Sequence, residues 1–166
     1  MAAQEVGVTI RVLVADDQAM IRGALAGLLD LERDIEVVAQ AADGVQALEE
    51  LARLATKDTQ SAQPPTNSAR PDSPADVAII DIEMPHMDGI TTTEAIRARF
   101  PGVRVLIVTT FGRPGYLQRA LDAGATGFMV KNAPVEALAE GVRTLAAGGR
   151  AIDQSLAVEA LSAGSS

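Results

Sequence analysis

The stretch IIDIEMPHMDG, residues 79–89, joins a strand-like apolar run to an acidic end. The apolar run ends on Asp81, and a turn that contains Met84, Pro85 and Gly89 follows. Proline and glycine are typical of turns, so the strand is expected to end at the carboxylate. Aspartate is seldom buried without a partner. Asp81 is therefore the first candidate functional group of this chain.

Short apolar runs of this kind alternate with segments whose apolar residues recur at helical spacing. The expected strands cover residues 9–16, 35–41, 76–81, 103–110 and 125–131. The expected helices cover residues 19–32, 44–55, 91–100, 115–124 and 134–149. Strands that are apolar throughout are typical of sheets covered on both faces, and regular alternation with helices indicates right-handed parallel crossovers. The pattern predicts an open, doubly wound α/β fold with five parallel strands.

The length of 166 residues fits one domain, because compact domains usually have ~100 to 200 residues. We expect residues 1–8 to be an N-terminal extension, residues 9–149 to form the domain, and residues 150–166 to begin a linker. Residues 56–75 are rich in Pro, Ser, Thr, Gln and Asn, which predicts a flexible surface loop between the second helix and the third strand. A docking role for this loop is the alternative to a solvated loop without function.

The composition excludes several classes of function. The chain has no cysteine, which removes disulfides, thiolate metal sites and thiol catalysis. Its net charge of -8 argues against binding a nucleic acid backbone by itself. The first residues lack a signal peptide, and no apolar run approaches the ~18 residues needed to span a bilayer. These features predict a soluble, cytoplasmic protein without a membrane partner.

Polar residues stand at the expected carboxyl ends of four strands: Asp16 with Asp17, then Asp81, Thr109 and Lys131. Ligands of doubly wound sheets bind beyond these strand ends, so the side chains are expected to converge on one edge. Carboxylates that gather there repel one another unless a cation is present. An oxygen-only set with few protein ligands suits Mg²⁺, and Mn²⁺ is a plausible substitute.

With that ion, a carboxylate can act as a nucleophile toward phosphorus and form an acyl phosphate. Asp81 is the candidate nucleophile. Phosphoryl transfer needs in-line positioning and positive charge on the equatorial oxygens, which the metal and the Lys131 ammonium could supply. The hydroxyl of Thr109 could donate to another phosphoryl oxygen.

These residues, with Asp81 in DIEMPHMDG, Thr109 in VTT and Lys131 in GFMVKNAP, resemble the receiver domain of two-component response regulators. The resemblance covers roughly residues 9–149 and implies a flavodoxin-like sheet with strand order 2-1-3-4-5. It implies that Asp81 accepts phosphate and that Lys131 pairs with this carboxylate. It also implies a protein that is phosphorylated by a donor and is not a turnover enzyme.

The resemblance further implies a role for each remaining residue of the site. Asp17 matches the direct metal ligand, and Asp16 matches its partner, which usually reaches the ion through water. Glu83 would offer its backbone carbonyl to the ion. Thr109 matches the switch hydroxyl, and Phe128 matches the aromatic residue whose rotamer follows the switch.

The segment TTFGRPGYLQRALDAGATGFMVK, with the helix and AGGR that follow, is similar to the NarL/FixJ branch, whose members carry a C-terminal helix-turn-helix domain. That domain is absent from this sequence. The implied partners are a histidine kinase, a second copy of the chain when phosphorylated, and promoter DNA through the further domain. Two departures from the family pattern are the inserted loop and Asn132 after Lys131.

Other interpretations of the same residues exist. Asp16 and Asp17 could cap a helix, Lys131 could be a solvated charge, and Phe128 could be only a core residue. A phosphatase with an aspartate nucleophile would need an acid two residues after it on the first strand, and Gln18 and Ala19 follow Asp17 instead. A pseudo-receiver that only binds a partner is the second alternative. The single histidine, His86, is expected to be exposed and passive.

Overall fold

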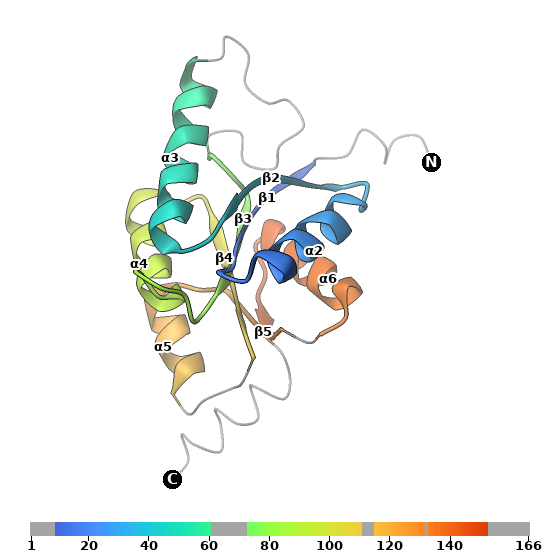
Figure 1. The fold of residues 1–166 in the computed structure, drawn as a ribbon, viewed down its shortest axis with the longest axis vertical. Coiled ribbons are helices and arrows are strands. Elements are labelled where there is room, and N and C mark those ends of the chain that lie inside the picture. The colour runs from blue at the N-terminus through green and yellow to red at the C-terminus, as the bar shows by residue number, and fades with distance from the viewer. Residues whose placement is uncertain (1–8, 61–72, 111–114, 132, 153–166) are drawn as a thin grey trace.

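A six-stranded, all-parallel sheet forms the centre of the computed structural model, which describes residues 9–60, 73–110, 115–131 and 133–152 (Figure 1). Its strand order is β2-β1-β3-β4-β5-β6. The strands are β1 (Ile10–Ala15), β2 (Ile35–Ala41), β3 (Val77–Asp81), β4 (Arg104–Thr109), β5 (Gly127–Val130) and β6 (Ala151–Ile152). The predicted parallel α/β fold and the order of its first five strands are confirmed.

Helices cover both faces of this sheet (Figure 1). They are α2 (Ala19–Asp30), α3 (Gly44–Gln60), α4 (Gly89–Arg99), α5 (Tyr116–Ala123) and α6 (Val135–Ala146). On one face α4 contacts both α3 and α5, and on the other α2 contacts α6. From β1 the chain goes first to β2 at one edge of the sheet, and then through β3, β4 and β5 toward the other edge. Among the described residues, no helix combines the length and apolar content that crossing a bilayer requires.

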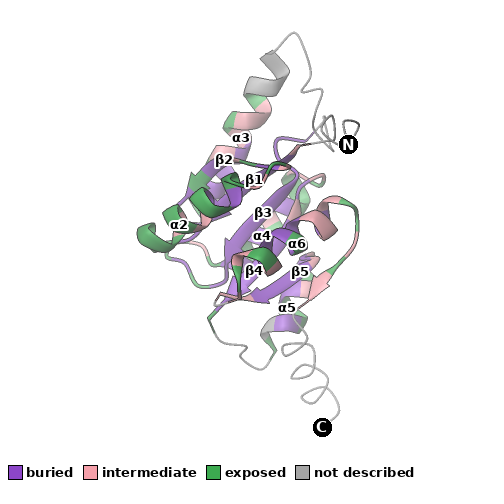
Figure 2. Ribbon diagram, turned by 90° about the vertical axis from the view of Figure 1, so that its right-hand side faces the viewer, coloured by how far each residue is buried: buried purple, intermediate pink, exposed green. Residues whose placement is uncertain are grey.

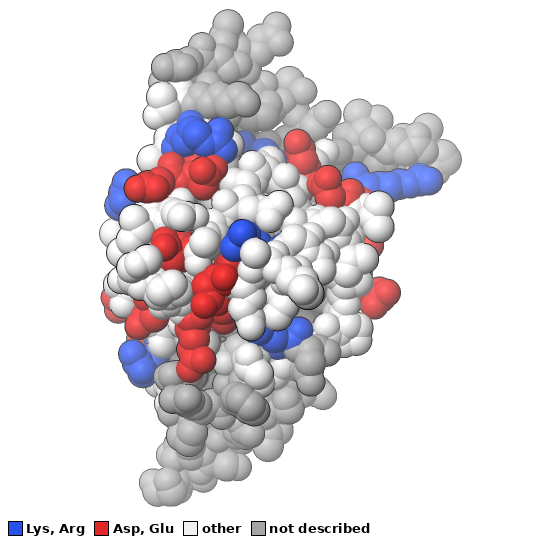
Figure 3. All heavy atoms as spheres, viewed as in Figure 1, with Lys and Arg blue, Asp and Glu red and all other residues white. Residues whose placement is uncertain are grey.

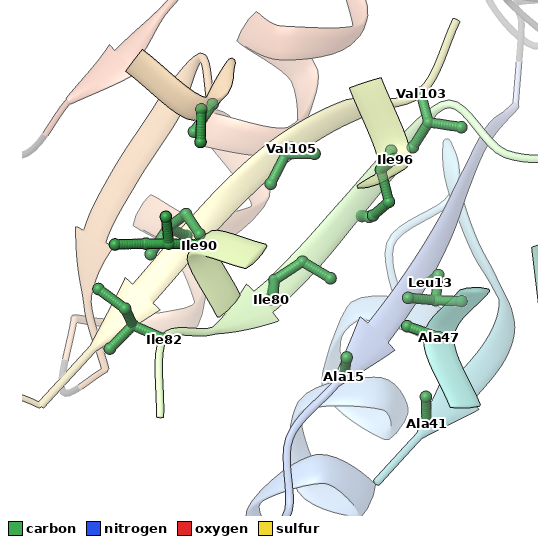
Figure 4. Packing of buried hydrophobic residues seen from close by; sticks show 14 of the residues in the cluster. Leu13, Ala15, Ala41, Ala47, Ile80, Ile82, Ile90, Ile96, Val103 and Val105 are labelled. Atoms are coloured by element: carbon green, nitrogen blue, oxygen red, sulfur yellow. The ribbon is translucent and has the colours of Figure 1, made fainter. Parts of the chain in front are cut away.

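Two apolar cores, one on each face of the sheet, explain why the strands are apolar throughout. Successive residues of a strand point to opposite faces. Leu13 and Ile80 therefore belong to the core under α3, α4 and α5, whereas Val12 and Ile79 belong to the core under α2 and α6. Figure 2 shows the strands as the buried centre, and Figure 4 shows how residues of the first core interlock.

A sixth strand is the main departure from the predicted fold. Ala151 and Ile152, in the segment expected to begin a linker, pair in parallel with Gly127 and Phe128 of β5. The amide of Ala151 donates to the carbonyl of Thr126 at 3.0 Å. The pairing satisfies backbone groups at the edge of β5. A strand of two residues is too short to leave a periodic pattern in a sequence, so pattern reasoning could not detect it.

The segment expected to be a loop, residues 56–75, is partly ordered. α3 continues through Gln60, and the hydroxyl of Thr56 donates to the carbonyl of Ala52 at 3.0 Å. Residues 73–76 are buried, although the composition of the segment indicated little to bury. Polar groups are tolerated there because they are paired, as in the 2.7 Å hydrogen bond from the Ser73 hydroxyl to the Ala75 carbonyl. Residues 61–72 of the predicted loop lie outside the described residues.

Candidate functional site

The carboxyl edge of the sheet carries an acidic cluster. Asp16, Asp17 and Asp81 each place one carboxylate oxygen within 4.8 Å of the others. Asp16 and Asp81 are buried, with 1% and 4% of their surface exposed, whereas Asp17 is exposed. The structure therefore brings two buried carboxylates and one solvent-facing carboxylate, from two separate strand ends, to one place.

The backbone of Asp16 is held by its neighbours. Its amide donates to the carbonyl of Ala41 at 3.0 Å, and its own carbonyl accepts from Nη1 of Arg22 at 2.7 Å. Its Oδ1 accepts from the amide of Gln18 at 2.9 Å. The Oδ2 atom is buried and lies 3.0 Å from Nζ of Lys131, with which it forms an ion pair. One carboxylate oxygen is therefore fixed by the backbone and the other faces the cluster.

Lys131 lies between the two buried carboxylates. Its Nζ is 3.0 Å from Oδ2 of Asp16 and 3.2 Å from Oδ2 of Asp81, and it donates to Oε1 of Gln18 at 3.1 Å. The amide of Lys131 donates to the carbonyl of Thr109 at 2.7 Å, which fixes the root of the side chain at the end of β4. One ammonium group therefore forms ion pairs with two carboxylates.

The charges shift two pKa values in this cluster. Burial raises the pKa of Asp81, repulsion by Asp16 adds to the shift, and Lys131 only partly opposes it. Burial alone would lower the pKa of Lys131, but hydrogen bonding and attraction from Asp16 and Asp81 outweigh burial and raise it. The cluster has more negative charge than its single cation compensates, so it favours the binding of a further cation.

The loop after β3 is packed tightly against Asp81. The amide of Gly89 donates to the carbonyl of Ile82 at 2.9 Å, and a Cβ at position 89 would stand 2.5 Å from the carbonyl oxygen of Asp81. Only glycine permits this approach. Asp88 caps α4, because its side chain accepts from the amide of Thr91. Glu83 is exposed at the start of this loop.

His86 in the same loop is exposed, as expected, but it is not passive. Its Nδ1 lies 2.8 Å from Oδ2 of Asp43, the residue before α3, and 71% of its side chain is exposed. Its backbone is left-handed, with φ of 69°. Hydrogen bonds from Gln46 and His86 lower the pKa of Asp43. The pair joins the loop after β2 to the loop after β3.

Thr109 and Phe128, the two residues expected to switch, are both buried. Thr109 ends β4 and is 3% exposed, and Phe128 on β5 is 1% exposed within the core under α3, α4 and α5. In the described structure Phe128 is therefore a core residue. Its register partner is Ile107, on the same strand as Thr109. Residues 111–114, which follow this strand, lie outside the described residues.

Sequence reasoning missed Gln18, Arg22 and Asp43. They support the site through hydrogen bonds to the backbone or to residues far away in the sequence, and such contacts leave no periodic pattern. Gln18 and Asp43 do occur at strand-to-helix turns beside the predicted strand ends, which is the one signal that could have identified them.

A cleft of about 440 Å³ opens beside the cluster. It is lined by Asp17, Ile82, Glu83, Met84, Pro85, Asp88, Ile90 and Arg119. Its lining includes the carboxylate of Asp17, and carboxylate oxygens are the ligands that Mg²⁺ prefers. The three carboxylates outnumber the single ammonium group of Lys131, which fits a site that receives a hydrated cation. The residues present therefore fit a magnesium ion.

Known proteins share both the sequence and the fold of this chain. The family model described as the response regulator receiver domain matches residues 12–143. The transcriptional regulatory proteins YvfU and DesR of Bacillus subtilis are 37% and 38% identical over 89% and 85% of this chain. The signal receiver domain of NarL from Mycobacterium tuberculosis superposes with a TM-score of 0.69 at 30% identity, covering 85% of this chain and 98% of that structure.

The chain spans less than two thirds of each of those two curated relatives, 64% of YvfU and 60% of DesR. The matched part is the receiver domain.

Proposed function

The chain belongs to the response regulator receiver domain family, and from that premise we propose that it accepts a phosphoryl group on Asp81. The observation that carries the proposal is the Lys131 ammonium, which lies 3.2 Å from Asp81 and 3.0 Å from Asp16. A lysine in this position can hold a carboxylate in place and then neutralise a phosphoryl oxygen.

The chemistry follows from the charges of the chain's own residues. A carboxylate oxygen of Asp81 attacks phosphorus, the bond from phosphorus to the donor breaks, and the electron pair of that bond leaves with the donor. For a phosphohistidine donor the leaving group is the imidazole nitrogen. Burial raises the pKa of Asp81, and the Lys131 ammonium opposes this rise, so the lysine favours the ionised carboxylate that attacks phosphorus.

Asp16, Asp17 and Asp81, with the backbone carbonyl of Glu83, are the proposed ligands of Mg²⁺, or of Mn²⁺ in its place. When bound, the ion offsets the negative charge of the carboxylates and of the incoming phosphoryl oxygens. Lys131 supplies a second positive charge, and the hydroxyl of Thr109 is the proposed donor to a third phosphoryl oxygen. The chain is not proposed to turn over a substrate.

The consequence of phosphorylation is proposed to be a change at the molecular surface. The added charge of roughly −2 would draw Thr109 inward, and the ring of Phe128 would move into the vacated space. Phe128 packs in one core with α5, so its movement would be transmitted to that helix. The switch is expected to favour homodimers of the phosphorylated chain.

The partners of the whole protein are likewise proposals. The relatives YvfU and DesR are transcriptional regulatory proteins. By analogy, a histidine kinase would supply the phosphoryl group, and a helix-turn-helix domain following the segment from residue 150 would contact promoter DNA in the cytoplasm. Residues 9–149 would form the receiver unit of such a protein.

Intact-mass measurement after incubation with Mg²⁺ and acetyl phosphate tests the proposal. The native chain is expected to gain the mass of one phosphoryl group, and Asp81→Asn is expected to gain none. Asp122→Asn is the matched control, because Asp122 is an exposed carboxylate on α5 bonded only to its neighbour Gln118 among the described residues.

The alternatives give different results in the same experiment. Failure of the native chain to gain a phosphoryl group, with Mg²⁺ present and the acetyl phosphate not consumed, would leave only the pseudo-receiver, which binds a partner without phosphorylation. Repeated turnover of acetyl phosphate without a stable adduct would indicate a phosphatase instead.

A further inference from the structure

A second cleft opens at the amino edge of the sheet, at the opposite end of the strands from the acidic cluster. It lies where β4, β5 and β6 begin, and its volume is about 280 Å³. Three arginines from separate parts of the chain line it: Arg97 on α4, Arg104 at the start of β4 and Arg150 just before β6. No acidic residue is part of the lining. We call this site the amino-edge cleft.

The positive charge of the amino-edge cleft contrasts with the rest of the molecule. The chain has a net charge of -8, and Figure 3 shows a band of acidic residues on the face that it presents. Elsewhere an arginine has carboxylate partners, as Arg143 has on three sides. Within the part of the chain that the structure describes, the side chains of Arg97 and Arg150 make no hydrogen bond or ion pair. Their charges are therefore available to an anion from outside the chain.

The helix ends nearby do not account for this charge. α4 and α5 both end beside the cleft, and the carbonyl end of a helix carries roughly half a negative charge. One arginine near such an end is therefore favourable without any ligand. Arg97 and Arg150 together carry more positive charge than the two helix ends offset. The cleft remains positive and attracts anions.

The glycine that caps α5 allows one of these arginines to lie in the cleft. Gly124 has a φ of 112°, and a Cβ at this position would stand 2.6 Å from Cδ of Arg97. Any side chain at position 124 would therefore displace the stem of Arg97. The amide of Arg104 donates to the carbonyl of Asp76 at 3.0 Å, which fixes the root of the second arginine. Side chains that are ordered before a ligand arrives lose less conformational freedom when it binds.

We propose that the amino-edge cleft binds a phosphate monoester of a small organic molecule. Guanidinium groups stay charged and present forked N–H donors that match the oxygens of phosphate. Three arginines from separate elements suit a tetrahedral group, whose oxygens point in several directions, better than a planar carboxylate. The cleft has room for more than a phosphate group, at about 30 Å³ for each water-sized unit, and the apolar residues Val103 and Leu121 line it beside the arginines.

This site is separate from the proposed phosphorylation site. Asp81 ends β3 at the carboxyl edge of the sheet, and neither it nor any other residue of the acidic cluster lines the amino-edge cleft. The proposal therefore adds a second, non-covalent phosphate site to the chain. No bond to phosphorus forms or breaks there.

An NMR titration of the ¹⁵N-labelled Asp81→Asn chain with phenyl phosphate in EDTA tests the proposal. Without Asp81 and metal, the phosphorylation site cannot take up the phosphate. The amide signals of Gly124, Ala125 and Thr126 in the cleft are expected to shift to saturation, and that of Ile82 at the other edge is expected to stay in place. Benzoate, which has the same ring and a planar carboxylate, is expected to bind at least about tenfold more weakly. Sodium chloride at equal ionic strength is expected to give no saturating shift.

Single arginine substitutions test which side chains hold the ligand. Arg97→Gln and Arg150→Gln are each expected to weaken phenyl phosphate binding by at least about tenfold, because each removes charge-assisted hydrogen bonds. Both arginines are exposed, so both variants are expected to fold, and the dispersion of their NMR spectra checks this.

Arg99→Gln is the matched control. Arg99 is an exposed arginine on the same helix as Arg97, but its guanidinium lies over the ring of Phe100, 5.3 Å from the centroid, and it does not line the cleft. The substitution removes the same charge from the chain. It is expected to change binding by less than about twofold, because solvent and salt screen a charge outside the cleft.

Three results would overturn the proposal. The first is the absence of a saturating shift at the three cleft amides. The second is equal binding of benzoate and phenyl phosphate, or an equal response to chloride. The third is an equal loss of affinity in Arg99→Gln and Arg97→Gln, which would indicate general attraction to a positive surface. Intact-mass measurement of the native chain decides the phosphorylation of Asp81 separately, so each proposal can fail without the other.

Discussion

Asp76 and Asp81 are buried carboxylates at opposite ends of the same strand, and they have opposite surroundings. Asp76, just before β3, is fully buried; its Oδ2 accepts from the amide of Arg11 at 2.8 Å and lies 3.6 Å from Nε of the same residue. The guanidinium of Arg11 also donates to the carbonyl of Ser73 at 2.5 Å. Asp81 shares one lysine with Asp16.

The difference shows how one strand can carry a structural carboxylate and the carboxylate proposed to accept phosphate. At the amino end of β3, the buried carboxylate of Asp76 is paired with the guanidinium of Arg11, so this pair has no excess charge that would attract a ligand. At the carboxyl end, two buried carboxylates share one ammonium group, and a third carboxylate is exposed beside them. The excess negative charge there favours cation binding. Four substitutions or changes of condition can break or sharpen this contrast.

The largest effect is expected from Asp76→Ala, which leaves the buried guanidinium of Arg11 without its carboxylate. Breaking a buried ion pair on one side typically costs about 3–5 kcal/mol. The free energy of unfolding, measured by urea denaturation, should fall by that amount. Phosphate uptake by the folded fraction should persist, because Asp76 lies at the far edge of the sheet. A loss below about 1 kcal/mol would mean that the pair contributes little, as surface pairs do.

The next effect is expected from magnesium, which should stabilise the folded chain through the acidic cluster. A ligand at 100 times its dissociation constant raises the free energy of unfolding by about 2.7 kcal/mol. Asp17→Asn should remove most of this gain while leaving the metal-free stability nearly unchanged, because Asp17 is exposed. Thermal unfolding with Mg²⁺ and with EDTA measures both quantities. An equal gain in Asp17→Asn and the native chain would place the metal elsewhere.

Asp81→Asn should stabilise the metal-free chain while it abolishes phosphorylation. The raised pKa of Asp81 means that its charged form costs stability, a cost that is present near neutral pH and disappears as the pH falls through the folded-state pKa. An uncharged amide removes that cost, with an expected gain on the order of 1 kcal/mol at neutral pH. Urea denaturation in EDTA measures the change. Asp76→Asn, which should destabilise the chain, is the matched comparison.

The smallest effect is expected at the surface pair of Asp34 and Arg143. Nε of Arg143 donates to Oδ2 of Asp34 at 2.8 Å, and this hydrogen bond lowers the pKa of Asp34. A lowered pKa stabilises the fold above the unfolded-state pKa of about 3.9, and this contribution is lost as the pH falls through the folded-state value. Since 42% of the Asp34 side chain is exposed, the contribution should be below about 1 kcal/mol.

Comparison of Arg143→Gln with the native chain, in urea near pH 7 and near pH 3, measures this contribution together with those of Glu32 and Glu140, which also pair with Arg143. The native chain should be the more stable of the two near pH 7, and the difference should shrink near pH 3. The sign is opposite to that for Asp81. An undiminished difference at low pH would show that Arg143 acts through packing and not through the charges of its carboxylate partners.

The sequence predicted the core of this fold because parallel strands covered on both faces leave long apolar runs. The strand ends then located Asp16, Asp81 and Lys131 on one edge of the sheet. The buried pair of Asp76 and Arg11 was not predicted, because partners so distant in sequence leave no local pattern. The polar composition of residues 56–75 predicted a loop, so the last residues of α3 were not predicted. A helix tolerates polar side chains there because its hydrogen bonds are made by the backbone.

The pairing of β6 with β5 has a geometric consequence for any longer form of this protein. β6 runs parallel to β5, so at Ile152 the chain is heading for the same rim of the molecule that bears Asp81. A module attached downstream would thus start its path on the side of the sheet that bears the proposed phosphoacceptor, next to the strand that contains Phe128. The proposed phosphorylation site and the start of such a module would then lie at the same edge of the sheet, connected through the backbone pairing of two residues of β6 with β5.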